Sequence, residues 1–165
     1  MRSFFKLFFL AISLICCAGV VPAQEPIPVD TLITLQRSTC LGTCPDYTLT
    51  ISGKGNVTFN GRFYVKVTEA KAKLDPKKVR ALIAAFETAS FFSLQDQYRT
   101  SKDGCPEVWT DNPMVNTSIR INGRSKAISH YHGCQSGDGS FIYPKALTEL
   151  EDQIDHIVGT KKWLK

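Results

Sequence analysis

Residues 47–65 decide the fold, and they read YTLTISGKGNVTFNGRFYV. Apolar residues alternate with polar ones on both sides of Gly53-Lys54-Gly55, a pattern typical of half-buried β-strands joined by a short turn. Folding the chain about Lys54 places Leu49 opposite Phe59, so that one face of the hairpin is apolar. The segment therefore predicts a β-hairpin that buries one face against the rest of the domain.

Two further strands extend this hairpin into a meander. The stretch from Thr31 to Arg37 is rich in β-branched and apolar residues and predicts a strand that precedes the hairpin. Residues 60–62 read Asn-Gly-Arg and predict a second turn, which sets Phe63 opposite Phe59 on a fourth strand. We therefore expect a four-stranded β-meander over residues 31–65.

Two amphipathic helices are predicted outside the meander. The first begins at Pro76 with Asp75 as its N-cap, because proline suits the first helical position. The second begins at Pro144 and ends before Gly159, because glycine is favoured just past a helix C-terminus. Apolar residues at helical spacing mark the buried faces, namely Val79, Leu82, Ile83 and Phe86 in the first helix and Leu147, Leu150, Ile154 and Ile157 in the second.

A long loop and a second hairpin lie between the helices. Alternating residues predict a strand from Val115 to Ile121, Asn122-Gly123 predicts a turn, and the return strand runs from Lys126 to His132. Residues 95–113 show no periodicity, and so long a loop in a small domain is either functional or held in place. These elements predict a single α+β domain over residues 30–165, with one mainly antiparallel sheet and both helices packed on one face.

The first 23 residues read as a secretory signal peptide. Arg2 and Lys6 form a charged start, residues 7–21 form an apolar run, and Ala23 suits the cleavage position. The run is shorter than the roughly 20 residues that a membrane-spanning helix needs. We therefore expect cleavage after Ala23, a short lead over residues 24–29, and a periplasmic or secreted chain without a transmembrane segment.

Cys16 and Cys17 lie within the apolar run of this leader. A lipid anchor would require a small residue just before the modified cysteine. Ile15 precedes Cys16, and Cys16 itself precedes Cys17. A lipid-anchored form is therefore less favoured than removal of both cysteines with the leader.

The charge of the chain excludes one class of partner. The net charge is +5, and removal of the two basic residues of the leader leaves about +3. No basic stretch is interleaved with aromatic residues, as surfaces that bind nucleic-acid strands are. Nucleic acid is therefore not an expected partner.

Several short motifs are spread along the mature chain. The most specific is the step Cys40-x3-Cys44-Pro45 between two predicted strands. It is accompanied by the hairpin 47–59, Phe91-Phe92-Ser93-Leu94, Thr110-Asp111, Asn122-Gly123, and Leu150 with Ile154-Asp155 and Trp163. Together these motifs resemble a bacterial family of uncharacterised exported proteins, the domain of unknown function 6438. The resemblance covers nearly the whole mature chain and implies an exported α+β domain without an agreed activity, so it assigns no catalytic residue.

Four cysteines remain in the mature chain, and an even number in an exported domain points to two disulfides. In an extended chain the Cα atoms of Cys40 and Cys44 would lie roughly 13 Å apart, whereas a disulfide needs less than about 7 Å. Gly42 allows the chain to turn back, so a Cys40–Cys44 bridge can form, which leaves Cys105 to pair with Cys134. Chain entropy separates the three connectivities only weakly, and the local bridge is favoured because it forms more easily.

Cys40 and Cys44 also raise the alternative of a thiol–disulfide redox centre. Dithiol catalysts usually have two residues between the cysteines and a helix N-terminus that lowers the pKa of the first thiol. Here three residues intervene, and the predicted neighbours on both sides are strands. The sequence therefore favours a structural disulfide.

His130 and His132 form a second candidate site. Residues at i and i+2 on a strand point to the same face, and two imidazoles with a thiolate can bind zinc or copper. Cys105 or Asp111 would have to complete the ligand set, and use of the thiols would exclude the Cys105–Cys134 disulfide. Because the set is incomplete, we expect the histidines to belong to a half-buried sheet, and we assign no metal or cofactor.

The sequence contains no recognisable catalytic arrangement. We therefore expect an exported, non-enzymatic domain that binds a protein or an envelope component. Its contact surface is expected at the long loop and around residues 130–139, with Trp109, Asp111, His130 and His132 as the candidate residues. The alternatives are a redox protein that uses Cys40 and Cys44, and a periplasmic metal-binding domain that uses the two histidines.

Overall fold

We describe residues 25–165 from a computed structural model, and the predicted signal peptide with Cys16 and Cys17 lies outside this range. The main sheet contains β1 (Leu32–Arg37), β2 (Asp46–Ser52), β3 (Asn56–Phe63), β4 (Glu69–Lys73), β5 (Gln97–Tyr98), β7 (Met114–Ile121) and β8 (Arg124–Tyr131). Two short strands, β6 (Glu107–Val108) and β9 (Cys134–Gln135), form a second sheet. The helices are α1 (Pro76–Thr88) and α2 (Lys145–Val158), with single 3-10 turns at η1 (Phe91–Ser93), η2 (Ser101–Asp103) and η3 (Thr160–Trp163).

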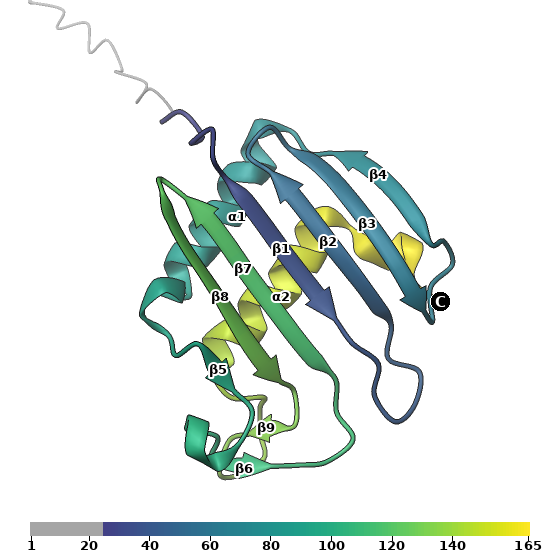
Figure 1. Ribbon diagram of the computed structural model, residues 1–165, viewed down its shortest axis with the longest axis vertical. Coiled ribbons are helices and arrows are strands. Elements are labelled where there is room, and N and C mark those ends of the chain that lie inside the picture. Colours follow the sequence, from purple (N-terminus) through teal and green to yellow (C-terminus); the bar gives the residue numbers. More distant parts are fainter. Residues whose placement is uncertain (1–24) are drawn as a thin grey trace, which may run out of the picture.

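The main sheet has the strand order β4-β3-β2-β1-β7-β8-β5. Its neighbouring pairs are antiparallel except β5 and β8, which run parallel. Figure 1 shows the sheet in front and both helices behind it. The predicted α+β architecture, with two helices on one face of a mainly antiparallel sheet, is therefore confirmed.

The hairpin around Lys54 forms with the expected register. Leu49 pairs with Phe59 and Ile51 pairs with Val57, and all four side chains are buried. Threonines occupy the alternate positions of β2 and are only partly buried. The alternation in the sequence therefore decides which face of the sheet carries the core.

The predicted turn at residues 60–62 is wrong. β3 continues through these residues with Gly61 opposite Tyr47, and the chain turns at Tyr64, where φ is 52°. Gly61 is needed for close packing instead, because a Cβ at this position would lie 2.8 Å from Cγ2 of Val65. A glycine that makes room for a neighbouring side chain has the same sequence signature as a glycine in a turn.

The fourth strand of the meander is consequently β4 rather than the segment around Phe63. β4 reads EAKAK and pairs with β3, so that Ala70 lies opposite Phe59 and Ala72 lies opposite Val57. Its two lysines are exposed at the edge of the sheet, where charged side chains discourage pairing with a second molecule. None of its residues is β-branched or aromatic, and so residue propensity does not predict a strand here.

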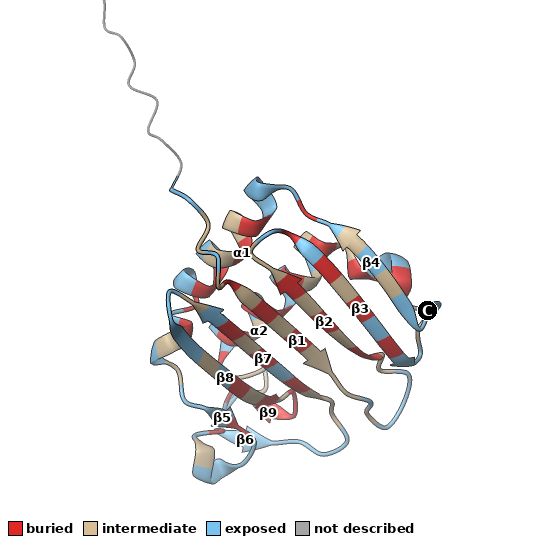
Figure 2. Ribbon diagram, turned by 45° about the horizontal axis from the view of Figure 1, so that its top comes forward, coloured by how far each residue is buried: buried red, intermediate tan, exposed pale blue. Residues whose placement is uncertain are grey.

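The core fills the space between the sheet and the two helices. In Figure 2 buried residues alternate with less buried ones along the strands, while β4 and β6 are largely exposed. Helix α1 begins at Pro76 as predicted, and the Asp75 carboxylate accepts a hydrogen bond from the main-chain N–H of Lys78. Helix α2 begins one residue later than predicted, with Pro144 as its N-cap, and Gly159 ends it in the left-handed conformation as predicted. The predicted apolar stripes are confirmed by six buried residues, and the other two, Ile83 and Ile157, are only partly buried. The buried six are Val79, Leu82, Phe86, Leu147, Leu150 and Ile154.

The C-terminal tail closes the core at the end nearest β3. The ring of Trp163 packs on Phe59 with 4.9 Å between centroids, and its main-chain oxygen accepts a hydrogen bond from Lys66. Trp163 therefore folds back onto the core, as predicted. Within residues 25–165, no helix combines the length and the apolar character that a membrane span requires.

Candidate functional site

Strand β8 brings two histidines to the face that the helices cover. His130 lies on β8 and His132 follows it, and the centroids of their rings are 4.9 Å apart. The side chain of His130 is fully buried, and that of His132 is 9% exposed. The i, i+2 spacing places both rings on one face, as predicted, but that face is the inside of the domain.

Glu151 on α2 joins the two histidines, although the sequence patterns above did not identify it. Its buried carboxylate lies 3.0 Å from Nδ1 of His130 and 2.8 Å from Nε2 of His132. We call His130, His132 and Glu151 the His–Glu group. One signal was present in the sequence: Glu151 lies one helical turn after Leu147, inside the apolar stripe of α2, where a carboxylate needs partners.

The electrostatics of the group centre on this carboxylate. Burial opposes ionisation of Glu151, but hydrogen bonds from His130 and His132, and the charge of these rings, outweigh burial and lower its pKa to about 2. The hydroxyl of Thr117 on β7 donates a further hydrogen bond to Oε1 at 3.2 Å. Glu151 therefore carries a negative charge in the interior that donors from β7 and β8 compensate.

His130 faces an acceptor at each of its ring nitrogens. Nδ1 faces the Glu151 carboxylate, and Nε2 lies 3.1 Å from the main-chain oxygen of Tyr143. A neutral imidazole has one N–H and one lone pair, so it can donate to only one of these acceptors. A metal ion bound at Nδ1 would leave the N–H at Nε2, where it faces the main-chain oxygen of Tyr143.

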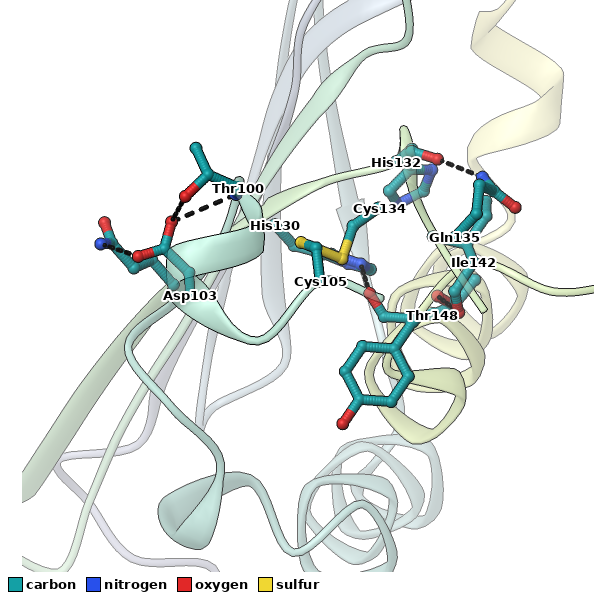
Figure 3. Close-up of a disulfide and its surroundings, with 11 residues drawn as sticks. Thr100, Asp103, Cys105, His130, His132, Cys134, Gln135, Ile142 and Thr148 are labelled. Atoms are coloured by element: carbon teal, nitrogen blue, oxygen red, sulfur yellow. Dashed lines mark hydrogen bonds between the residues drawn. A yellow bond between two sulfur atoms is a disulfide. The ribbon is translucent and has the colours of Figure 1, made fainter. Parts of the chain in front are cut away.

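The Cys105–Cys134 disulfide lies beside the two histidines (Figure 3). Both cysteines are buried, and the main-chain oxygen of Cys134 accepts a hydrogen bond from the N–H of Tyr143, the residue that also binds His130. Cys105 and Cys134 are bonded to each other, and Glu151 lies beside the two histidines in the place where the sequence suggested Cys105 or Asp111.

Trp109 is held at the surface next to this disulfide. Its main-chain N–H donates to the oxygen of Gly133, beside Cys134, at 2.8 Å. Its indole N–H donates to Glu107 at 3.1 Å, and its ring covers Gly139, where a Cβ would lie 2.9 Å from Cζ2. Trp109 is nevertheless 49% exposed. We call β6, Trp109, β9 and residues 136–140 the Trp109 platform.

Residues 136–140 are ordered by their own side chains. The carboxylate of Asp138 accepts hydrogen bonds from the hydroxyls of Ser136 at 2.6 Å and Ser140 at 2.8 Å. These hydrogen bonds lower the pKa of Asp138 to about 2, and the bond from Ser136 has the largest effect. The loop beneath the indole ring is therefore held in one conformation without regular secondary structure.

The second disulfide closes the loop between β1 and β2. The Cα atoms of Cys40 and Cys44 are 5.5 Å apart, so the chain turns back within these residues as expected. Strands flank the loop on both sides, and Cys40 therefore lacks the helix N-terminus that activates dithiol catalysts. The main-chain N–H of Leu41 donates to the oxygen of Asp111, which places this loop against the segment that follows Trp109.

A comparison with known protein families identifies the family of this chain. Residues 31–158 match the family model described as a domain of unknown function, DUF6438. The chain belongs to this family. The matched range of the DUF6438 domain includes both disulfides, Trp109 and the His–Glu group, whereas Trp163 lies after it. No curated protein matches the chain.

The four surface candidates from the sequence separate into two sets in the DUF6438 domain. Trp109 and Asp111 are exposed on one loop. His130 and His132 are buried and cannot contribute to a contact surface, which corrects that part of the prediction. Both histidines are buried because alternate residues of a strand point to the same face. His130 and His132 lie two and four residues after Ile128 of β8, whose side chain points inward.

Proposed function

We propose that this is an exported, non-enzymatic domain that binds a protein or an envelope component through the Trp109 platform. One observation carries the proposal: a half-exposed indole is fixed on a support cross-linked by a disulfide. Tryptophan is enriched among the residues that dominate binding energy in protein interfaces. A side chain that is already ordered loses little conformational entropy when a partner binds.

Further apolar residues extend the platform. Val108 and Phe141 are exposed at the same end of the molecule, and Leu41, in the adjoining disulfide loop, is 81% exposed. Carboxylates of Glu107 and Asp111 lie beside Trp109 in the sequence and are also at the surface. A partner that presents an apolar side chain next to a basic group suits this surface better than a small metabolite does.

Export is supported by two independent features. The leader over residues 1–23 has the charge and apolar run of a signal peptide. Two disulfides are consistent with a location outside the cytoplasm, because thiols stay reduced inside it. Both features support a periplasmic or secreted location, and a lipid-anchored form is the less favoured alternative.

Site-specific photo-crosslinking in a bacterium that exports the protein tests the proposal. A photoreactive phenylalanine replaces Trp109 in one variant and Leu41 in another. We expect both variants to form an adduct with the same protein, or to become fixed to isolated cell-wall sacculi. The matched control carries the same group at Lys77, which is exposed on α1 and distant in sequence from both loops.

The pattern of adducts decides the outcome. Equal labelling at Lys77 and Trp109 would indicate random collisions, and an absence of adducts at Trp109 and Leu41 would contradict a binding role for the platform.

A thiol–disulfide exchange role for Cys40 and Cys44 is tested separately. A reduction potential near those of known dithiol catalysts would support it, and a much lower potential would support a structural bridge.

A further inference from the structure

We propose that the His–Glu group is a structural zinc site. Nδ1 of His130, Nε2 of His132 and a carboxylate oxygen of Glu151 lie within 4.8 Å of one another. Two imidazole nitrogens and one carboxylate are a set of three protein ligands that occurs in zinc sites, and a buried water molecule would supply the fourth ligand of a tetrahedral ion. Because the histidines come from β8 and the turn after it and the carboxylate comes from α2, the ion links the sheet to the helix.

Side-chain rotations would bring the distances within the group to those of a zinc site. With bonds of about 2.0–2.2 Å, the ligand atoms of a tetrahedral zinc ion lie about 3.3 Å apart. Oε2 of Glu151 lies 3.0 Å from Nδ1 of His130 and 2.8 Å from Nε2 of His132. To hold the ion, the carboxylate oxygen would move outward by a few tenths of an ångström. The two ring nitrogens, which lie within 4.8 Å of each other, would move closer together by rotation of their side chains.

Contacts around the group orient its ligands. With zinc at Nδ1 of His130, the ring N–H would be at Nε2, where the main-chain oxygen of Tyr143 lies 3.1 Å away and can accept it. The hydroxyl of Thr117 binds Oε1 of Glu151 and leaves Oε2 facing both histidines. Metal-binding histidines and carboxylates usually have such outer partners.

Burial and chemistry both favour a structural ion. The side chains of His130 and Glu151 are fully buried and that of His132 is nearly so, which leaves no access for a substrate. No thiol takes part, since Cys105 and Cys134 are bonded to each other. The site is therefore compatible with the oxidising compartment in which disulfides form.

Measurements on the unmodified protein test the proposal first. The exported protein is purified through a cleavable tag without histidines, and its metal content is measured by mass spectrometry. We expect about one zinc ion per chain, and zinc added to chelator-treated protein should raise Tm by about 10 °C at roughly 100 times Kd. A folded protein that holds no zinc and whose Tm does not respond to zinc overturns the proposal, whatever the variants do.

Three variants then locate the ion. His132→Gln and Glu151→Gln should each weaken zinc binding at least about 100-fold in titration calorimetry, because each removes one ligand. The matched control is His156→Gln, since His156 is the remaining histidine and is exposed on α2. Wild-type affinity in His156→Gln supports the site, and an equal loss in all three variants contradicts it. Unfolding of a variant is detected by its circular dichroism, and the unmodified protein then decides the question.

Discussion

At the scale of single residues, the interior of the domain is organised around the Glu151 carboxylate. Thr117 on β7, His130 on β8 and His132 just after it surround the Glu151 carboxylate of α2. The negative charge of Glu151 is therefore compensated only when β7, β8 and α2 are all correctly placed. Removing one member of such a cluster leaves the others buried without a partner. The His–Glu group therefore restricts how α2 can lie on the sheet.

Replacement of Glu151 by glutamine is expected to destabilise the metal-free domain by about 3 kcal/mol or more. The amide keeps the shape of the side chain but removes the negative charge and turns an N–H₂ group toward a histidine nitrogen. Urea unfolding at neutral pH in the presence of a chelator measures the effect. Glu149→Gln is the matched control, because Glu149 is two residues away and 66% exposed, and it should change stability by less than about 0.5 kcal/mol. Equal effects of the two substitutions would contradict a special role for Glu151.

Acid should destabilise the metal-free domain through the same carboxylate. The pKa of Glu151 is lowered from 4.5 to about 2 in the folded state. Its contribution, about 3 kcal/mol, is therefore complete above about pH 4.5 and is lost as the pH falls toward about 2. Urea midpoints measured across this range check the effect. The Glu151→Gln variant should lose less stability than the unmodified chain over the same interval, and parallel curves would refute this assignment.

At the scale of elements, the two disulfides stabilise loops that the sheet does not hold. The Cys40–Cys44 bridge closes a short turn between adjacent strands, and the Cys105–Cys134 bridge ties the long loop to β9. The second bridge also fixes the base of the Trp109 platform. The two bridges are therefore expected to differ in their effect on stability and on surface structure.

Removal of each bridge by paired serine substitutions measures this difference. The chain-entropy relation gives about 2 kcal/mol for Cys40→Ser with Cys44→Ser, and about 3.6 kcal/mol for Cys105→Ser with Cys134→Ser. Only the second pair should also shift the fluorescence of Trp109, because only that bridge holds its platform. Trp163→Phe in all the proteins compared leaves Trp109 as the one tryptophan and isolates its signal. A larger loss of stability from the first pair would contradict the entropy argument.

Sequence patterns predict the elements whose residues follow one simple rule. The period of two in residues 47–59 gives the register of β2 and β3, and Asp75 with Pro76 gives the start of α1. The end of β3 was not predictable, because Gly61 serves the packing of Val65 rather than a turn. β4 was not predictable either, since alanine and lysine form an edge strand there only because β3 offers a partner.

The candidate site was predictable only in part, for a related reason. The pairing of His130 with His132 follows from strand geometry, and the cysteine pairing follows from the reach of a short loop. The third member, Glu151, lies nearly twenty residues further on another element, and only the packing of α2 on β8 brings it close. Its position in an apolar stripe indicates burial but does not identify the partners.

At the scale of the whole molecule, β1 joins the two halves of the sheet. It pairs with β2 on one side and with β7 on the other, although β7 lies about eighty residues later in the chain. Ile33 and Leu35 on β1 are completely buried. The edge strand β4, by contrast, pairs with β3 alone and consists of exposed and partly buried residues.

Hydrogen exchange should report this arrangement directly. Amides of β1 are expected to exchange only when the whole domain unfolds, because both of its neighbours and the core must open first. Amides of β4 should exchange at least about 100-fold faster, through local separation from β3. Mass spectrometry of peptides that cover residues 32–37 and 69–73 measures both rates in one experiment. The Cys40→Ser, Cys44→Ser variant is a control. Loss of this disulfide lowers the global stability, so the amides of β1 should exchange faster than in the unmodified protein. The amides of β4 should still exchange faster than those of β1. Protection of β4 equal to that of β1 would show that the meander unfolds as one unit and that β1 is not the central element.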